Sequence, residues 1–481
     1  MKLQQQESRV SLDKMPDKDF LEIVIVGLGV GGLYASKSAL QFNRKCHVTI
    51  IEKRDFDQFS PCGLPFVIEG LIKDFDALRY DVPEFSKKLT KLLYHEVIAV
   101  DHEKKVLKVL DLAKSMEKEI SYDSLILATG ASPINLPIPG AKEFLGKGIH
   151  FVSDMKNSRE LFEAARSSGK KMALVVGGGA MGLEVAAGLK KMGLDVSVTK
   201  RTPHPFPRNL DPAMGKLIIE HLEGLGIRVL FGKGIDSING DQKVEYVEIA
   251  GEKIDCDIVV MAVGMRGNLK LAEMTGAKTK NGFVIVNNRM ETTVEGVYAV
   301  GDLVQTYSRI DGTPTTMQLA TAAYMQGMAA GINAAGGNTF YPGALNTFLT
   351  VIGDLEIAST GYTLEAAKGL GYDARAISTM RETKPHYMPD ATQINLRVIC
   401  DSRDGRLLGA QAVGREGAAW RINIFALAIH GGMTLYDISD AELSYNPPFS
   451  QMYDAIAQVA EVGLKRLGLP PRKCEKVFFP E

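Results

Sequence analysis

The sequence is poor in net charge and has no long apolar run. Among 481 residues, 56 Lys and Arg balance 57 Asp and Glu, so no net field exists to attract nucleic acid or an acidic membrane. No apolar stretch approaches the ~18 residues of a membrane helix, and residues 1–6 are too polar for the core of a signal peptide. We therefore expect a soluble, cytoplasmic protein without a membrane or nucleic-acid partner.

Cysteine is also scarce, and this scarcity restricts the chemistry. Cys62 stands in the segment Phe-Ser-Pro-Cys-Gly-Leu-Pro, yet position 67 is Val67, so a two-thiol redox centre of closely spaced cysteines is excluded. The remaining cysteines are scattered along the chain: Cys46, Cys256, Cys400 and Cys474. Unpaired cysteines of this kind are typical of a reducing compartment. Redox chemistry at Cys62 would run on one sulfur, and we expect no metal site.

A glycine-rich loop near the N-terminus predicts a dinucleotide site. Residues 21–26 read as a β-strand, and Gly27, Gly29 and Gly32 follow at the spacing G-x-G-x-x-G before a helix-like stretch. Such glycines allow a tight turn and close approach of a pyrophosphate to the helix N-terminus. The next strand ends in Glu52, 20 residues beyond Gly32, where a carboxylate accepts hydrogen bonds from ribose. Because strand, spacing and acid occur together, a chance glycine-rich turn is the weaker interpretation.

The same pattern recurs in the second quarter of the chain. Residues 172–176 form an apolar run that leads into Gly177, Gly179 and Gly182, and residues 195–199 form a further strand. Two dinucleotide folds in one chain imply two dinucleotides. This is the arrangement needed to move a hydride from a nicotinamide to a bound flavin.

The two copies differ at the residue that meets the ribose. The strand after the second loop ends at Lys200 and Arg201 instead of an acid. An acid would repel a 2′-phosphate, whereas these cations would attract one, so we expect NADPH to be preferred over NADH. The alternative is that Lys200 is an ordinary surface charge.

Five motifs together resemble the pyridine nucleotide-disulfide oxidoreductase family of FAD-dependent enzymes, over residues 21–465. They are the two glycine loops, Ala128-Thr129-Gly130, Ala262-Val263-Gly264 and the segment ending in Gly301-Asp302. The resemblance implies an α/β fold with two Rossmann-like domains, for FAD and NAD(P), and a C-terminal α+β dimerisation domain. It also implies that Asp302 holds the ribityl chain of the flavin and Glu52 the adenosine ribose. The other cofactor-binding positions that it implies are Lys53, Arg54, Ala128, Thr129, Gly130, Glu184, Gly264, Gly301, Leu319 and Ala320.

The single-cysteine branch of this family is the most similar. It includes coenzyme A disulfide reductases, NAD(P)H oxidases, NADH peroxidases and sulfur or polysulfide reductases, and the segments Cys-Gly-Leu-Pro and 443–450 look like the first of these. The resemblance makes Tyr445, delivered by a partner subunit of a homodimer, a candidate proton donor or disulfide-orienting group at the sulfur, with Tyr387 as a second tyrosine. The alternative is that Tyr445 is a packed aromatic residue. Further candidates for substrate or coenzyme A contact are Lys37, Ser60 and Phe449.

Two departures from the family pattern bear on the activity. Peroxidases and water-forming oxidases of the family carry a histidine in the first loop, where this chain has Val30. Without that imidazole, the peroxidase interpretation lacks its acid-base residue. The aromatic residue often found in the second loop is replaced by Ala180, so access to the flavin is less shielded.

The position of Cys62 suggests its chemistry. A cysteine at the N-terminal end of a helix has a lowered pKa, and the thiolate that results is the reactive species. In a one-cysteine cycle, the thiolate attacks a disulfide, and two electrons from NAD(P)H pass through FAD to cleave the mixed disulfide. Polysulfide, peroxide and O2 are alternative electron acceptors. A more remote alternative function is that of a regulatory flavoprotein that does not turn over a substrate. A buried, inert Cys62 is the other reading of the residue.

Length and motif order predict the division into domains. At 481 residues the chain should contain about three domains. We expect an FAD-binding domain at 21–150 and 284–342, an NAD(P)H-binding domain at 151–283 and a dimerisation domain at 343–470. Residues 1–20 and 471–481 are expected to be peripheral.

Overall fold

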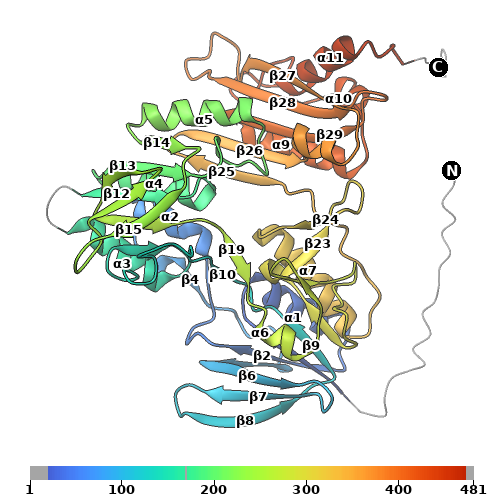
Figure 1. The fold of residues 1–481 in the computed structure, drawn as a ribbon. Coiled ribbons are helices and arrows are strands. Elements are labelled where there is room, and N and C mark those ends of the chain that lie inside the picture. The colour runs from blue at the N-terminus through green and yellow to red at the C-terminus, as the bar shows by residue number, and fades with distance from the viewer. Residues whose placement is uncertain (1–19, 168–170, 473–481) are drawn as a thin grey trace, which may run out of the picture.

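The computed structural model describes residues 20–167 and 171–472 and consists of three packed units (Figure 1). The first contains a five-stranded parallel sheet in the order β22-β9-β1-β2-β5. Its strands are β1 (Leu21–Val26), β2 (Cys46–Glu52), β5 (Leu89–Leu93), β9 (Ser124–Leu127) and β22 (Val297–Ala299). Because β22 pairs with β9, segments about 170 residues apart in sequence build one sheet.

Helices and smaller sheets complete the first unit. Helix α1 (Val30–Phe42) packs on α7 (Ala320–Ala334). The 3-10 turn η3 (Gly301–Leu303) leads directly into strand β23 (Val304–Tyr307). An antiparallel meander is formed by β6 (His95–Asp101), β7 (Val106–Asp111) and β8 (Met116–Ser121). A four-stranded sheet contains β20 (Thr279–Lys280), β21 (Phe283–Ile285), β23 (Val304–Tyr307) and β24 (Pro314–Thr316), with α6 (Lys270–Met274) nearby in sequence.

The second unit repeats the parallel architecture, in the order β11-β18-β12-β13-β14. The strands are β11 (Ile149–Phe151), β12 (Met172–Val176), β13 (Asp195–Lys200), β14 (Arg228–Phe231) and β18 (Ile258–Met261). Its helices are α3 (Met155–Arg166), α4 (Ala180–Lys191) and α5 (Pro212–Gly224). A three-stranded antiparallel sheet adds β15 (Ile235–Asn239), β16 (Tyr246–Ile249) and β17 (Glu252–Asp255).

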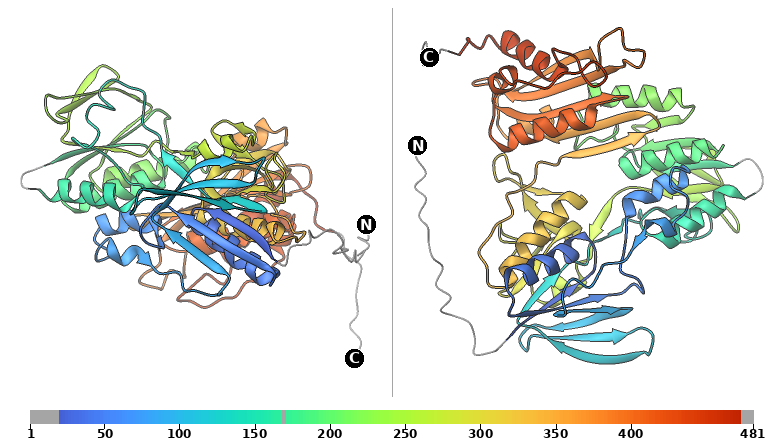
Figure 2. Two further views of the ribbon diagram at one scale, coloured as in Figure 1. Left: turned by 90° about the horizontal axis from the view of Figure 1, so that it is seen from below. Right: turned by 180° about the vertical axis from the view of Figure 1, so that it is seen from behind.

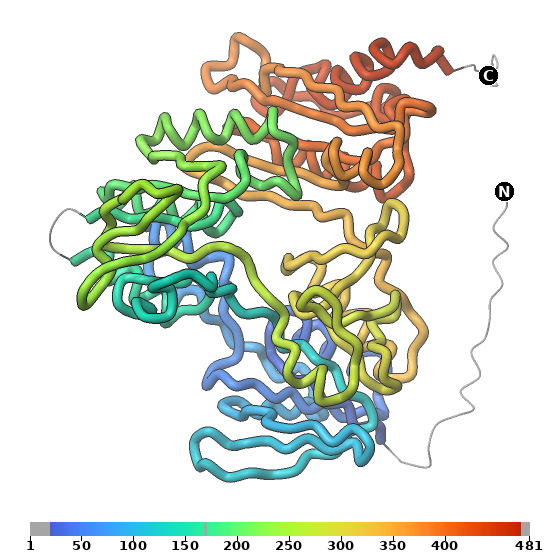
Figure 3. Tube along the Cα trace, viewed as in Figure 1, coloured from blue at the N-terminus to red at the C-terminus, as the bar shows by residue number. Residues whose placement is uncertain are grey.

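A two-stranded ribbon joins the two parallel units. Strand β10 (Ala131–Pro133) pairs antiparallel with β19 (Met265–Gly267), so the chain leaves and re-enters the first unit side by side. Figure 3 traces this passage between the lower and the left-hand parts of the molecule.

The third unit is an antiparallel sheet in the order β25-β26-β29-β28-β27. It contains β25 (Phe348–Ile352), β26 (Leu355–Gly361), β27 (Ala374–Glu382), β28 (Gln393–Asp401) and β29 (Leu407–Gly414). The accompanying helices are α8 (Leu364–Gly369), α9 (Ala418–His430), α10 (Leu435–Ser439) and α11 (Ala455–Leu467). Seen from behind, this unit lies above the first unit, and the green second unit lies at the right (Figure 2, right).

These observations confirm the expected fold class of two Rossmann-like units and a C-terminal α+β unit. Strands predicted at 21–26 and 172–176 occur at those residues, and the strand predicted at 195–199 extends one residue further, to Lys200. Within the described ranges, no helix is long and apolar enough to cross a membrane. The same residues contain no group of three or more His, Cys, Asp or Glu side chains that could hold a metal ion.

Candidate functional site

The first glycine loop connects β1 to α1, and two of its glycines are required by close backbone contacts. Gly27 has a φ of +106°, and a Cβ there would lie 2.3 Å from the carbonyl oxygen of Ala128. A Cβ on Gly32 would lie 2.0 Å from the carbonyl oxygen of Gly27. Gly29 is different, because a Cβ there would meet nothing within 4 Å. Open space next to Gly29 fits the approach of a bound phosphate to the backbone.

Glu52 lies directly under this loop at the end of β2. Its Oε2 accepts a 2.7 Å hydrogen bond from the Leu28 N–H, and Arg54 bonds both carboxylate oxygens at 2.9 and 3.0 Å. Burial opposes ionisation, but the hydrogen bonds and charge of Arg54 outweigh it and lower the pKa of Glu52. Because Arg54 also donates its backbone N–H to Glu52, each oxygen already has two donors. Binding of a ribose at Glu52 would require Arg54 to move. Lys53 points elsewhere and pairs with Glu96 at 2.8 Å.

Asp302 lies in η3, beside the start of α7. Burial raises the pKa of Asp302 to about 6, and its carboxylate accepts no hydrogen bond from any residue in the described ranges. The Gln318 side chain donates to the Asp302 carbonyl oxygen at 3.5 Å, which places Leu319 and Ala320 next to it. A half-buried, desolvated carboxylate without a protein donor is costly in the protein alone, so this position fits a ligand that carries hydroxyl groups.

A second orphaned group lies at the first loop. The Gln58 side chain donates to the Leu28 carbonyl oxygen at 3.0 Å, but its own Oε1 is buried without a partner. Like Asp302, it fits a bound molecule that supplies donors. Sequence reasoning missed Gln58, because it follows the loop by 26 residues and carries no motif.

The turn Ala128-Thr129-Gly130 follows β9 and is held by a residue that the sequence did not indicate. The Asn268 side chain donates to the Thr129 carbonyl oxygen at 2.8 Å, and the Thr129 hydroxyl donates to the Asn268 carbonyl oxygen at 3.2 Å. Asn268 comes directly after β19. The turn is therefore fixed by the ribbon that joins the two parallel units.

The second glycine loop repeats the geometry of the first. A Cβ on Gly177 would lie 2.1 Å from the Ala262 carbonyl oxygen, a Cβ on Gly182 would lie 2.6 Å from that of Gly177, and Gly179 again faces open space. Gly264 has a φ of +115° and lies at the start of the return strand β19.

Cations gather beside this second loop. The Lys200 side chain lies against the loop, because a Cβ on Gly178 would come within 2.9 Å of its Cδ. Burial and the neighbouring Arg208 lower the pKa of Lys200. Arg201 is exposed. Arg208 was not indicated by the sequence, since it lies in an irregular segment eight residues beyond the strand.

Cys62 lies in the 3-10 turn η1 (Pro61–Gly63), which runs into the short helix α2 (Leu64–Ile68). The turn is held against η2 (Asp76–Leu78), since the Ser60 N–H donates to the Leu78 carbonyl oxygen at 2.9 Å. The adjoining ribbon pairs β3 (Gln58–Phe59) with β4 (Arg79–Tyr80). Of the cysteines in the described residues, Cys62 alone is exposed.

The expected lowering of the Cys62 pKa is wrong for the protein alone. The surrounding protein atoms desolvate the sulfur, and Glu184 and Asp302 add negative charge, so the pKa of Cys62 is raised despite a backbone hydrogen bond. The helix that follows has only five residues and contributes little dipole. The influence of both acids shows, however, that Cys62 lies close to residues of both glycine-loop units.

Glu184 in α4 also contacts the third unit. It accepts a 2.5 Å hydrogen bond from the Thr350 hydroxyl in β25, and burial raises the pKa of Glu184. Tyr80 is a second neighbour that the sequence did not indicate, since the charge of Cys62 contributes to the raised pKa of this phenol after burial. Groups of the first and second units therefore lie near Cys62, and Glu184 connects them to the third unit through Thr350.

The two candidate tyrosines lie together in the third unit. Their hydroxyl groups are 3.4 Å apart, and Tyr387 and Tyr445 are 61% and 43% exposed. The hydrogen bond between the two hydroxyl groups raises the pKa of Tyr445. Phe449 is 73% exposed in the same loop region. The single chain thus presents these aromatic side chains to solvent.

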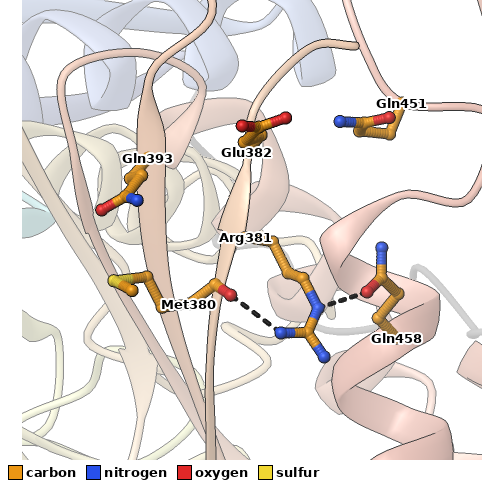
Figure 4. A pocket seen from close by; sticks show the side chains of 6 residues that line it. All are labelled: Met380, Arg381, Glu382, Gln393, Gln451 and Gln458. Atoms are coloured by element: carbon orange, nitrogen blue, oxygen red, sulfur yellow. Dashed lines mark hydrogen bonds between the residues drawn. The ribbon is translucent and has the colours of Figure 1, made fainter. Parts of the chain in front are cut away.

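The remaining substrate candidates give weaker signals. Lys37 on α1 lies over the rings of Tyr34 and Phe85, at 5.5 and 5.7 Å. Ser60 caps η1 through backbone geometry and makes no side-chain capping bond. A separate pocket of about 350 Å³ in the third unit is lined by Met380, Arg381, Glu382, Gln393, Gln451 and Gln458 (Figure 4). The Arg381 guanidinium already donates hydrogen bonds to Gln458 and to the Met380 carbonyl oxygen. Its charge therefore gives no indication of a bound ligand.

Comparison with known proteins decides the family. The family model described as pyridine nucleotide-disulphide oxidoreductase matches residues 21–327, and that of its dimerisation domain matches residues 347–456. The chain belongs to this family. It is accordingly an oxidoreductase of the FAD- and NAD(P)H-dependent class, with a dimerisation domain at its C-terminal end.

Relatives of this oxidoreductase differ in their named activities. The NADH oxidase of Methanocaldococcus jannaschii is 36% identical, with 93% of this chain and 99% of the relative covered. The NAD(P)H sulfur oxidoreductase (CoA-dependent) of Pyrococcus furiosus is 32% identical, with 92% and 98% covered. Among solved structures, a NAD-dependent persulfide reductase from A. fulgidus is 30% identical, with a TM-score of 0.88 over 93% of this chain and 84% of that chain.

Proposed function

We propose that this enzyme reduces a low-molecular-weight disulfide, most specifically coenzyme A disulfide, with NADPH as the donor and Cys62 as its single redox residue. The observation that carries the proposal is the position of the exposed Cys62 thiol, which lies within reach of the charges of both Glu184 and Asp302. The Cys-Gly-Leu-Pro segment and the Tyr445 segment support coenzyme A disulfide as the substrate.

The residues of the two loops fit the two dinucleotides. FAD would be held by the first loop, Glu52, Asp302 and the start of α7, and NADPH by the second loop with Lys200, Arg201 and Arg208. The unbonded carboxylate of Asp302 and the open space beside Gly29 support this assignment. When bound, FAD supplies a two-electron carrier between the nicotinamide and sulfur.

The chain's own chemistry consists of thiol–disulfide exchange at Cys62. The thiolate attacks one sulfur of R–S–S–R, forms a mixed disulfide and releases R–S⁻, which takes up a proton. Two electrons from NADPH then cleave the mixed disulfide, which returns the Cys62 thiolate and a second R–S⁻. Each turnover converts one disulfide, one NADPH and one proton into two thiols and NADP⁺. Tyr445, delivered by a second subunit, is placed by this proposal as the proton donor to the leaving sulfur.

Persulfide or polysulfide reduction is the second candidate. The names of the Pyrococcus furiosus and A. fulgidus relatives favour it, and it would use the same sulfur through a Cys62 persulfide. NADH oxidation by O2 is a third, favoured by the name of the Methanocaldococcus jannaschii relative. A screen of NADPH and NADH against coenzyme A disulfide, polysulfide and O2 separates the three.

Replacement of Cys62 tests the mechanism directly. Cys62→Ser should retain FAD and its reduction by NADPH, because the glycine loops, Glu52 and Asp302 are unchanged. Turnover of any disulfide or polysulfide should disappear, because a serine hydroxyl does not ionise near neutral pH and forms no disulfide. Steady-state rates, with mass spectrometry of the untreated enzyme for an adduct on Cys62, are the measurement. Near-normal disulfide turnover by Cys62→Ser would rule out the mechanism, whereas persistence of the O2 reaction alone would not.

A further inference from the structure

A cavity of about 690 Å³ lies in the second unit, away from its glycine loop. Its lining includes Gly148, Lys171 and Ile258, which stand at or just before the first residues of the parallel strands β11, β12 and β18. Gly177 follows the last residue of β12. The cavity is therefore at the amino end of the sheet, opposite the end where the nicotinamide dinucleotide would bind.

His150 is the buried polar residue of this cavity. It is the second residue of the edge strand β11 and is 8% exposed, and its Cα partner Val260 belongs to the apolar cluster that includes Leu161 and Ala165 of α3. The imidazole lines the cavity but makes no hydrogen bond to any residue in the described ranges. Burial lowers the pKa of His150. A neutral imidazole at this position offers one donor and one acceptor to a molecule in the cavity.

Four lysines converge on the same cavity from four segments. Lys147 precedes β11, Lys156 lies on α3, Lys171 precedes β12 and Lys243 lies between β15 and β16. Across residues 20–167 and 171–472, none of their ammonium groups forms an ion pair. Arg159, a fifth cation of the lining, already pairs with Asp76 at 3.4 Å.

Acidic groups are present but fewer. Asp257 is engaged by the Met172 N–H at 3.0 Å, and Glu160 and Glu163 lie on α3. Five cationic and three acidic side chains leave the lining positively charged. A ligand that matches it would present a multiply charged anion to the lysines and hydroxyl donors to the glutamates. The volume is within the range of small-molecule sites, about 300–1,000 Å³.

We propose that this cavity is a second ligand site of the enzyme, for a phosphorylated small molecule that carries free hydroxyl groups, such as a sugar phosphate. The phosphate contacts the lysine ammonium groups, and the His150 imidazole donates to the same ligand. Because the cavity lies at the amino end of the sheet, the ligand binds while both dinucleotides are bound. The site does not depend on which disulfide or oxidant is reduced at Cys62.

Ribose 5-phosphate, inorganic phosphate and ribose are suitable probes for calorimetric titration of the FAD-loaded enzyme saturated with NADP⁺. We expect one ribose 5-phosphate per chain, weaker binding of inorganic phosphate and no binding of ribose. The exposed pair Lys147→Ala/Lys243→Ala should weaken ribose 5-phosphate binding at least tenfold, without loss of FAD or of NADPH turnover. Lys216→Ala, on α5 outside the cavity, is the matched control and should leave binding unchanged.

The proposal is overturned if ribose 5-phosphate shows no saturable binding up to about 10 mM, well above the range of specific metabolite sites. It is also overturned if the double variant binds like the wild type, if Lys216→Ala weakens binding equally, or if inorganic phosphate binds as tightly as ribose 5-phosphate. Competition by NADP⁺ would assign the binding to the second glycine loop and likewise contradict it.

Discussion

At the scale of single residues, the site depends on charges whose neighbours come from distant parts of the chain. Lys200 lies beside the second glycine loop, and burial together with the nearby charge of Arg208 lowers its pKa. Two cations held together in the protein alone repel each other. A 2′-phosphate placed between them would relieve that repulsion, which is the physical basis for the proposed preference for NADPH.

Lys200→Glu should therefore reverse the nicotinamide preference. A charge-assisted hydrogen bond to phosphate contributes about 1.5–3 kcal/mol, so the ratio of kcat/KM for NADPH and NADH should change by about tenfold or more. Arg208→Ala should shift the same ratio in the same direction by a smaller factor. Lys216→Glu, which makes the same charge change on α5, should leave it unaltered. A wild-type enzyme that clearly prefers NADH would contradict the assignment.

Asp302 gives a prediction about pH. Because burial raises its pKa from 3.8 to about 6, the folded FAD-free protein binds more protons than the unfolded chain between these values. Stability contributed by the protonated carboxyl is thus present at low pH and lost as pH rises through about 6. Asp302→Asn cannot ionise, so its advantage over the wild type should grow from pH 4 and reach about 1–3 kcal/mol at pH 7.

Urea denaturation of the FAD-free proteins at several pH values measures this effect. The same variant should bind FAD more weakly, since the carboxylate is the proposed partner of the ligand's hydroxyl groups. A gain in stability together with a loss of FAD affinity in Asp302→Asn would identify Asp302 as a residue retained for binding. Equal stability of the two proteins at pH 7 would contradict the burial argument.

At the scale of elements, each strand–loop–helix unit uses its glycines in two ways. Gly32 is required by packing, since its Cβ would overlap the backbone of Gly27, whereas Gly29 faces open space with a φ of −80° that any residue adopts. The structure thus separates a glycine needed for folding from one needed for the ligand.

Gly32→Ala and Gly29→Ala should accordingly behave differently. Gly32→Ala should lower the free energy of unfolding of the FAD-free protein by about 1–3 kcal/mol, because the backbone must shift to admit the methyl group. Gly29→Ala should leave that free energy within about 0.5 kcal/mol, yet weaken FAD binding. Thermal denaturation and fluorescence titration with FAD measure the two quantities. Equal effects of both changes on the FAD-free protein would show that Gly29 also serves packing.

The sequence predicted the elements more completely than the site. The strand–loop–helix pattern, Glu52 and the second loop could be found because turn, glycine spacing and acid are adjacent along the chain. Asn268, Arg208 and Tyr80 could not, because each meets its partner only after the chain folds back on itself. The lowered pKa expected for Cys62 was wrong for the same reason, since desolvation and two distant acids outweigh the local backbone.

At the scale of the whole molecule, the third unit exposes an aromatic loop region. Tyr387, Tyr445 and Phe449 are exposed in the single chain, and Met452 is 78% exposed beside them. Exposed apolar side chains gathered in one region are typical of protein interfaces. The match of residues 347–456 to a dimerisation domain agrees with that interpretation.

We expect the active enzyme to be a homodimer whose subunits exchange Tyr445. Cys62→Ser and Tyr445→Phe homodimers should each be impaired, whereas a mixed dimer of the two variants should regain one complete site. About half of the dimers in a randomised equimolar mixture are mixed, which sets the activity expected from complementation. Activity of tagged, purified mixed dimers is the measurement. A fully active monomer in sedimentation, or mixed dimers no better than their parents, would exclude sharing.

The short helix α2, which directly follows the turn with Cys62, belongs to the first unit by sequence but packs against the second. Leu64, Val67 and Ile68 share an apolar cluster with α4, and a Cβ on Gly188 would lie 3.1 Å from the Glu69 amide nitrogen. A chimaera that received residues 151–283 from a relative would therefore replace the surface against which α2, next to Cys62, is packed. Transplanting that domain to change coenzyme use would disturb the thiol at the same time, whereas exchange of single side chains around Lys200 would not.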